Sequence, residues 1–306
     1  MMRVVVGAGA AGRADLALAA QVDGTSRKLL QRAFAEGKVR LNGRRARKGD
    51  RVAPGDVLEV EGVPDRASLA PVPQPELALS VVWQDEHLVA IDKPPGMKSM
   101  PLVAGERGTL ASALVARYPE CRDAGADPRE AGLGHRLDAG TSGLLLAARH
   151  RGAWRALRDA FRHGRVAKQY LALVEGTVEA TRVVTAPIVH DRSGAGGVRA
   201  DAGAGGLPAT TEIRPELRLG AYSLVRCLAH SGRMHQVRAH LAWAGWPCVG
   251  DARYGARPTE LATEGPFLHA ARLELLHPVS GEPLTLDVRL PAGRARLVAS
   301  LAGQNG

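Results

Sequence analysis

The sequence predicts an α+β protein in which a small α/β domain precedes a larger domain built on a mixed or mainly antiparallel sheet. Three observations lead to this prediction. The chain has 306 residues, which is enough for two domains. Residues 63–77 contain four prolines and little periodicity, as expected of a linker between domains. Strand and helix patterns beyond this linker do not alternate regularly, which argues against a purely parallel sheet.

The composition indicates a globular protein with a polyanionic partner. Hydrophobic residues make up 45% of the chain and charged residues 24%, and the formal net charge is +10. No apolar stretch is long enough to cross a bilayer. The three cysteines, Cys121, Cys227 and Cys248, form no C-x-x-C pair, which indicates neither a zinc ribbon nor a disulfide framework. We therefore expect a cytoplasmic protein without a membrane anchor or a bound metal.

A glycine pattern at the start of the chain raises the alternative of a dinucleotide-binding fold. Gly7, Gly9 and Gly12 fit G-x-G-x-x-G, which in that fold lies between a strand and a helix and precedes a second parallel strand ending in an acidic residue. Here an amphipathic helix follows, and then the hairpin signal Asn42-Gly43. We therefore expect residues 1–11 to form a flexible tail, and no tight binding of NAD(P)H.

Residues 12–62 have the features of a small basic domain. Apolar side chains recur at helical spacing between residues 27 and 35, with Ser26 as the candidate N-cap. Residues 39–41 and 57–60 have strand character. Ten lysines and arginines lie between residues 27 and 51, against two acidic residues. A solvated charged face is the simpler explanation, but such an excess of like charge favours contact with RNA or DNA. The candidate contacts are Arg27, Lys28, Arg32, Lys38, Arg40, Arg44 and Arg45.

Residues 78–306 contain the elements of the larger domain. The patterns predict a hairpin over residues 80–91, helices at 109–118, 151–161 and 237–244, and strands at 144–148, 170–174, 182–187 and 222–229. Residues 268–290 have strand character on both sides of a turn at 278–283. The glycine-rich residues 193–207 predict a mobile hairpin tip.

Asp138 is the first candidate for chemistry in this domain. It lies in a polar, turn-rich segment directly before the apolar run 144–148, so a buried strand anchors its loop. A carboxylate there can be partly desolvated and still ionised if a cation pairs with it, which suits a nucleophile or a general base. The local sequence also allows a simpler role, in which the side chain satisfies the amides of a turn.

Two further stretches carry candidate residues. Lys168 and Tyr170 share one face of a predicted strand, where Tyr170 either presents its hydroxyl to a substrate or packs in the core. His230, His235 and His240 are spaced five residues apart, which splays them on a helix and alternates them on a strand, so we expect no metal site. Arg238 begins a helix among apolar residues, and a half-buried arginine needs an anionic partner such as Asp138.

Together these stretches resemble one family, the RluA-type pseudouridine synthases. HRLDAGTSG at residues 135–143 resembles the family motif H-R-L-D-x-x-T-S-G, and KQYLALVEG at 168–176 resembles K-x-Y-x-A-L-V-x-G. SGRMHQVRAHLAWAGWPCVGDARYG at 231–255 resembles T-G-R-x-H-Q-I-R-x-H-L followed by G-x-P-I-x-G-D-x-x-Y-G. The resemblance covers residues 78–300, and several motifs in the right order make it specific. Residues 12–60 resemble the small RNA-binding domain first described in ribosomal protein S-four.

The resemblance implies an isomerase that converts uridine in RNA to pseudouridine without a metal or an organic cofactor. Asp138 matches the catalytic aspartate, Tyr170 the tyrosine that stacks on the base, and Arg238 the residue that pairs with the aspartate. Further substrate contacts are expected from the surrounding motif residues Arg136, His135, Thr141, Arg233, His235 and Gln236. The basic domain favours ribosomal RNA of the large subunit over transfer RNA as the substrate, and we expect a monomer. A synthase acting on transfer RNA, and a non-catalytic RNA-binding or ribosome-assembly factor, are the alternatives.

Overall fold

The computed structural model describes residues 1–21, 27–62, 66–191, 197–203, 205–259, 261 and 264–303. Contacts divide the chain into two compact units. The first comprises Met1–Val72 with Pro101–Arg107 and Asp127–Arg129, and the second comprises Pro73–Met100, Gly108–Ala126 and Glu130–Gly306. The boundary falls inside the predicted linker. However, the linker ends before residue 77, because Gln74 already bonds within the second unit, to the carbonyl of Ser112 and the amide of Gly108.

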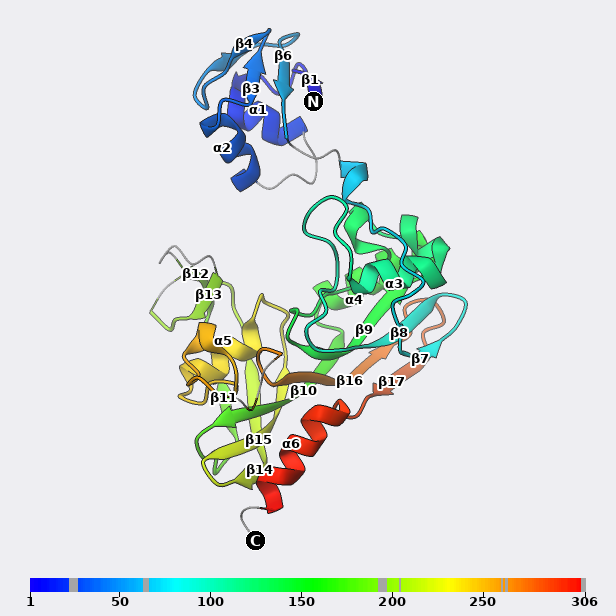
Figure 1. Ribbon diagram of the computed structural model, residues 1–306, viewed down its shortest axis with the longest axis vertical. Coiled ribbons are helices and arrows are strands. Elements are labelled where there is room, and N and C mark those ends of the chain that lie inside the picture. Colours follow the sequence, from blue (N-terminus) through cyan, green and yellow to red (C-terminus); the bar gives the residue numbers. More distant parts are fainter. Residues whose placement is uncertain are drawn as a thin grey trace. The chain divides into compact units, whose positions relative to one another are not determined.

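The first unit is a four-stranded antiparallel sheet packed on two helices (Figure 1). Its strands run in the order β1, β6, β3, β4, and a short pair, β2 with β5, lies outside the sheet. Leucine, valine and phenylalanine side chains from both helices and three of the strands form its core. The elements are β1 (Met2–Val5), β2 (Gly12–Arg13), α1 (Ala14–Gln21), α2 (Arg27–Ala35), β3 (Val39–Leu41), β4 (Arg44–Arg45), β5 (Arg51–Val52) and β6 (Val57–Val60). A short 3₁₀ turn, Arg66–Leu69, follows β6.

The start of the chain is not the flexible tail that the sequence predicted. Strand β1 pairs with β6 along its whole length, and Val6 is buried in the core of the unit. Because every pairing in this sheet is antiparallel, the glycine pattern after β1 lacks the parallel βαβ frame that a dinucleotide site needs. Asn42 and Gly43 form the predicted turn between β3 and β4, with φ angles of 49° and 81°. The predicted N-cap Ser26 lies outside the described residues.

The second unit is built on a nine-stranded sheet that confirms the predicted α+β class. Eight strands follow the order β11, β14, β15, β10, β16, β9, β8, β7, and β17 pairs with β16. All these pairings are antiparallel except that of β9 with β16. The strands are β7 (Val81–Gln84), β8 (Leu88–Lys93), β9 (Ser142–Ala148), β10 (Val166–Glu175), β11 (Arg182–Val184), β14 (Thr211–Leu219), β15 (Tyr222–Ala229), β16 (Leu268–Leu276) and β17 (Pro283–Asp287).

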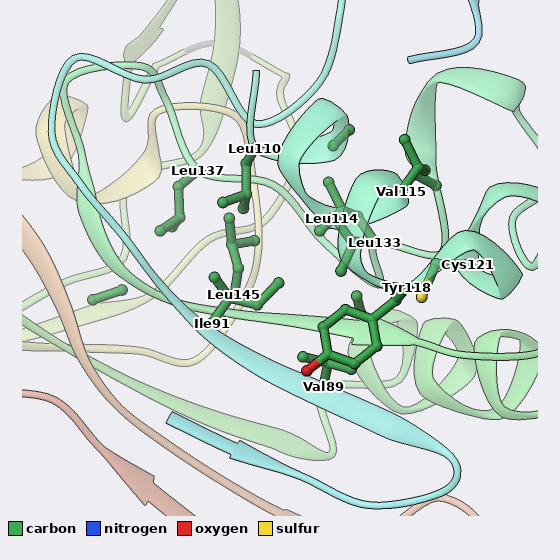
Figure 2. Close-up of a cluster of buried hydrophobic side chains, with 14 residues drawn as sticks. Val89, Ile91, Leu110, Leu114, Val115, Tyr118, Cys121, Leu133, Leu137 and Leu145 are labelled. Atoms are coloured by element: carbon green, nitrogen blue, oxygen red, sulfur yellow. The ribbon is translucent and has the colours of Figure 1, made fainter. Parts of the chain in front are cut away.

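Helices cover both faces of the sheet around β9, which explains why that strand is apolar throughout. Leu145 packs with Val89, Ile91 and helix α3 (Leu110–Arg117) in the cluster of Figure 2. Leu144 and Leu146 point to the opposite face, where helix α4 (Arg151–Arg162) contributes Leu157. Side chains alternate along a strand, so a strand buried on both sides needs an unbroken apolar run.

The 3₁₀ turns Pro119–Asp123 and Pro128–Glu130 follow α3 at the same end of the sheet. Helices α5 (Gln236–Trp243) and α6 (Ala292–Gly303), the hairpin β12 (Ile188–Asp191) with β13 (Gly197–Ala200), and the 3₁₀ turn Ala252–Tyr254 lie towards the other end (Figure 1). The predicted mobile tip at 193–207 corresponds in part to β13, while residues 192–196 and 204 lie outside the described residues.

Candidate active site

The loop that carries Asp138 is held in place by side chains from three other segments. Lys93, at the end of β8, donates from Nζ to the carbonyl of Ala139 at 3.0 Å. Ser99 donates to the carbonyl of Leu137 at 2.7 Å and accepts from its amide. Arg294 of α6 donates to the carbonyl of Gly140 at 2.8 Å. The loop therefore presents Asp138 from a fixed backbone.

Asp138 shares an arginine with a second, deeply buried aspartate. Arg238 of α5 donates from Nη1 to Asp138 Oδ2 at 2.8 Å. Its Nε and Nη2 donate to the two oxygens of Asp251 at 2.6 and 2.8 Å. The Asp251 side chain is 1% exposed and that of Asp138 is 23% exposed, so only Asp138 can meet a substrate. Asp251 thus anchors the guanidinium, and the guanidinium holds Asp138.

The electrostatics of this triad keep Asp138 beside a permanent cation. Burial lowers the pKa of Arg238, but the hydrogen bonds and charges of Asp251 and Asp138 outweigh it and raise that pKa above its usual value. Arg238 therefore remains protonated and places a permanent positive charge 2.8 Å from Asp138 Oδ2. An ionised carboxylate with one exposed edge can act as a nucleophile or as a base.

His235 and Tyr254 complete the surroundings of Asp138. His235 precedes α5 in a left-handed conformation, with φ of 50°, and its Nε2 lies 3.5 Å from Asp138 Oδ1. Its Nδ1 lies 3.1 Å from the Tyr254 hydroxyl, which donates to the carbonyl of Val198. The Arg238 guanidinium lies over the Tyr254 ring, 5.1 Å from its centre. Burial lowers the pKa of His235, while the charge of Asp138 raises it, and the net shift is downward.

Tyr170 reaches the same place from the middle of the sheet. It pairs with Ala270 of β16, and Ala270 pairs in turn with Gly143 at the start of β9, so the register aligns Tyr170 with the end of the Asp138 loop. A bulge in the β10–β16 pairing occurs at this point. Burial first, and then the charge of Asp138, raise the pKa of the Tyr170 phenol, which is therefore a neutral ring with a bound proton.

A cleft of about 360 Å³ opens beside Tyr170. Five cationic side chains line it together with the rings of Tyr170, His135 and Phe161: those of Arg136, Arg158, Arg162, Lys168 and Arg233. None of the five forms an ion pair with a carboxylate of the described residues. The cleft therefore combines an aromatic wall with uncompensated positive charge, which suits a planar ring attached to an anionic chain.

Three of the other predicted substrate contacts line this cleft. Arg136 and Arg233 line the cleft, as does His135, which stacks on Phe161 with ring centres 4.3 Å apart. His135 also accepts a hydrogen bond from the Leu146 amide through Nε2. Burial lowers its pKa to about 3, so this ring is neutral at physiological pH.

Two predicted contacts with the substrate, Gln236 and Thr141, are buried inside the protein. Gln236 is 4% exposed, and its amide accepts from Ser231 and Arg233 and donates to Thr210 and Thr211. These four bonds use its hydrogen-bonding capacity, so Gln236 shapes the loop before α5 and is not available to RNA. Thr141 is also buried and its backbone amide closes the Asp138 turn, but its hydroxyl forms no hydrogen bond with the described residues.

The predicted contacts in the first unit lie on its surface. Arg40, Arg44 and Arg45 are exposed on the β3–β4 hairpin, where Arg40 and Arg45 are directly opposite each other. Arg32 and Lys38 both pair with Glu36, which neutralises part of their charge. Arg27 and Lys28 begin α2, and their side chains lie outside the described residues.

Sequence reasoning missed the residues that support Asp138 from behind. Asp251 lies within the motif GDARYG, and an aspartate beside a glycine is typical of a turn, so the local sequence gives no signal that Asp251 is buried. Lys93 is the last residue of the mainly apolar strand β8 and precedes two prolines. Arg294 gives no comparable signal, because it lies in a helix 154 residues from the carbonyl it binds.

Neither a metal centre nor a membrane segment is evident among the described residues. They contain no group of three or more histidine, cysteine, aspartate or glutamate side chains placed to hold an ion. None of the helices in the described ranges has the length and apolar character that crossing a bilayer requires.

Comparison with known proteins agrees with this geometry. Residues 87–243 match the family model described as RNA pseudouridylate synthase. An uncharacterized RNA pseudouridine synthase of Chloroflexus aurantiacus is 39% identical over 92% of this chain and 87% of its own length. A ribosomal large subunit pseudouridine synthase D of Xanthomonas campestris is 35% identical over 98% of this chain and 92% of its own length. The solved structure of human RNA Pseudouridylate Synthase Domain Containing 1 covers 75% of this chain and 97% of its own, with 25% identity and a TM-score of 0.57.

Proposed function

The chain belongs to the RNA pseudouridylate synthase family and is an RNA uridine isomerase, and we propose that Asp138 is its catalytic residue and ribosomal RNA of the large subunit its substrate. The observation that carries the first part is the Asp138–Arg238–Asp251 arrangement, in which one carboxylate is partly exposed and the other anchors the cation. The register of β10, β16 and β9 aligns the end of the Asp138 loop with Tyr170, and Tyr170 lines a cationic, ring-lined cleft, which fits chemistry on a nucleotide.

The reaction rearranges bonds without adding or removing atoms. The bond between N1 of uracil and C1′ of ribose breaks, the base turns, and C5 forms a new bond to C1′ while its hydrogen leaves and N1 gains one. Attack on C1′ and removal of a ribose proton are the two first steps open to Asp138, and in both the carboxylate acts beside the guanidinium of Arg238.

Tyr170 provides the surface against which the base turns. Its neutral ring can stack on uracil at a gain of about 1–3 kcal/mol. Because its pKa is raised, the phenol keeps its own proton and can only relay the proton that leaves C5. The target nucleotide must leave its stack to reach this pocket, at a cost of a few kcal/mol. Contacts to the flanking phosphates offset that cost.

Two observations favour ribosomal RNA as the substrate. The Xanthomonas relative, whose name is ribosomal large subunit pseudouridine synthase D, matches 98% of this chain and therefore both units. The first unit, which we propose is an RNA-binding domain like that of ribosomal protein S-four, exposes Arg44 and Arg45 on one hairpin. Arg45 directly opposite Arg40 destabilises the hairpin unless a polyanion lies between them, which supports this role.

The substrate is tested with unmodified transcripts. The full chain is incubated with large-subunit ribosomal RNA and, separately, with a set of transfer RNAs, and pseudouridine is mapped at nucleotide resolution. We expect a discrete site in the ribosomal transcript. Modification of transfer RNA alone would replace the ribosomal proposal by the transfer RNA alternative and leave the isomerase activity intact.

The role of the first unit is tested by removing its hairpin charges. Arg44→Gln combined with Arg45→Gln should raise KM and leave kcat unchanged. The slope of log affinity against log salt concentration should become shallower by about 0.7 for each phosphate that the hairpin no longer binds. Arg13→Gln is the matched control, because Arg13 already pairs with Asp15 in the same unit. An unchanged salt dependence in the double variant would show that the hairpin does not bind RNA.

A further inference from the structure

Two buried lysines in the second unit differ in their surroundings. Lys93 is fully buried, and its ammonium donates to the carbonyls of Pro94, Met97 and Ala139. Lys168 of β10 is 7% exposed, and no residue of the described ranges forms a hydrogen bond or ion pair with its ammonium. An unpartnered buried ammonium is costly, so a protein that keeps one has a use for it.

The Lys168 side chain lies at the active-site cleft. It lines the cleft together with Tyr170, and its Nζ is the nearest atom to a Cβ built on Gly232, at 4.0 Å, at the cleft's edge. Lys168 and Tyr170 are two residues apart on a strand, so their side chains leave the same face about 7 Å apart. A ligand that stacks on Tyr170 therefore has Lys168 within reach of its neighbouring atoms.

Four arginines from three other segments surround the same space. Arg158 and Arg162 are one turn apart on α4, and Arg136 and Arg233 come from the loops before β9 and α5. Arg158 is oriented by its bond to the carbonyl of Gly134. Burial lowers the pKa of Lys168, and no carboxylate of the described residues pairs with it to offset that effect. An incoming anion would offset that effect.

We propose that this cleft binds a phosphate group of the RNA chain beside the target uridine, with Lys168 as the buried anchor and Arg158 as its partner. The inference rests on the proposed function, since it places the phosphate next to a base stacked on Tyr170. A phosphate presents several oxygens to cations that converge from different directions, and planar guanidinium groups bind it in pairs of bonds. The uracil ring is uncharged, so it has no need of five cations.

The test compares Lys168→Met with Lys168→Arg. The probe is a stem–loop RNA that contains the uridine modified by the wild type, with or without a single neutral methylphosphonate linkage beside that uridine. Arg226→Met is the matched control, because it removes a cation from the adjacent strand β15 that already pairs with Glu216. Unfolding midpoints verify that each variant folds, and Lys168→Met should be at least as stable as the wild type because it removes an unpaired buried charge.

We expect Lys168→Met to weaken binding and raise KM by about tenfold. The slope of its log affinity against log salt concentration should become shallower by about 0.7, which is the contribution of one phosphate contact. Lys168→Arg should retain most of the affinity, and the control should behave as the wild type. A methylphosphonate at one position should lower the RNA affinity of the wild type as much as Lys168→Met does. The same linkage should not lower the affinity of Lys168→Met any further.

Unchanged affinity and salt dependence in Lys168→Met would overturn the proposal. So would a loss confined to kcat with a displaced pH profile, because that result assigns proton transfer to the lysine. Binding of a ten-residue oligouridine, measured by fluorescence anisotropy at several salt concentrations, needs no turnover. One further outcome is that the wild type forms no pseudouridine in any RNA while its oligouridine binding still depends more steeply on salt than that of Lys168→Met. That result would refute the proposed function and retain the phosphate site.

Discussion

At the scale of single residues, the site depends on an arginine shared between two aspartates of unequal exposure. Asp251 accepts two hydrogen bonds from Arg238 and is sealed from solvent, while Asp138 accepts one and keeps an exposed edge. The planar guanidinium suits this arrangement because its donors point in fixed directions. A lysine has a single nitrogen, so it could not give Asp251 a planar two-bond fork and Asp138 a separate donor as Arg238 does.

Asp251→Asn should therefore weaken both the fold and the reaction. The buried guanidinium keeps its charge but loses its main counter-charge, at a cost of about 3 kcal/mol in the free energy of unfolding. Because Arg238 then moves, kcat should fall while KM changes little. Urea unfolding and steady-state kinetics measure both effects. Asp159→Asn is the control, since Asp159 pairs with Arg165 on the surface and should cost less than about 1 kcal/mol. Equal losses in the two variants would refute the anchoring role.

The pairing of Arg238 with Asp138 was predictable and that with Asp251 was not predicted. A half-buried arginine among apolar residues needs an acid, Asp138 was the candidate, and the resemblance to a known family agreed with that choice. The sequence contains several other acids, and nothing local separates a buried aspartate such as Asp251 from a surface one. The same limit applies to Gln236, whose exposure was assumed from its motif and whose amide is in fact used within the protein.

At the scale of elements, the site depends on the one parallel pairing in the large sheet. Strand β9 joins β16 through His269 with Ser142 and Ala270 with Gly143, directly after the Asp138 loop. Gly143 has φ of 108°, and a Cβ there would lie 2.2 Å from the carbonyl oxygen of Ala270. The glycine permits the close approach that brings the loop and Tyr170 to the same edge.

Gly143→Ala should consequently separate β9 from β16. The methyl group meets backbone that cannot move away, so we expect a loss of about 3 kcal/mol or more in the free energy of unfolding, together with loss of activity. Gly281→Ala is the control, because Gly281 also has a positive φ but a methyl group there would meet no atom within 4 Å. Its cost should be about 1 kcal/mol. Calorimetry of the two variants measures the loss of unfolding free energy in each. Similar losses would show that the close approach of Gly143 to Ala270 does not determine the cost.

Most elements were predictable because their periodicity is strong. The helices α3 and α4 and the strand β15 lie where spacing and turn residues indicated. Strand β1 was missed because a short valine run before glycines gives the same pattern whether it is paired or free. The parallel junction of β9 and β16 was also beyond local patterns, since direction is fixed by contacts between residues far apart in the chain.

At the scale of the whole molecule, buried neutral histidines make stability depend on pH. Burial lowers the pKa of His269 to about 4, below the ordinary value near 6.5. Between these values the unfolded chain binds a proton that the folded chain does not. The contribution to stability is thus complete above about pH 6.5, is lost progressively as the pH falls from 6.5 to 4, and does not fall further below 4.

We therefore expect the free energy of unfolding to fall by about 2 kcal/mol between pH 6.5 and 4.5 on account of His269 alone. Urea denaturation at a series of pH values measures this slope. His269→Gln should flatten the curve in that range, whereas His190→Gln, at an exposed position, should leave it as in the wild type. Parallel curves for the wild type and His269→Gln would contradict the assignment.

The charge of the chain predicted the class of its partner, and the structure adds where that charge gathers. Exposed arginines lie on the hairpin of the first unit, and a second group lines the cleft of the second unit. Composition alone does not separate these two groups, because it counts charges without their positions. The choice of uridine depends on those positions and on the RNA itself.

The most direct test of the account is pseudouridine formation by the wild type and by Asp138→Asn in RNA that lacks the modification. Mapping at nucleotide resolution should show a discrete site with the wild type. The variant should be slower by at least about a thousandfold, the scale of loss of a catalytic nucleophile or base, with RNA binding retained. Modification at the same rate by the variant, or by neither protein while both bind RNA, would contradict Asp138 as the catalytic residue of this enzyme.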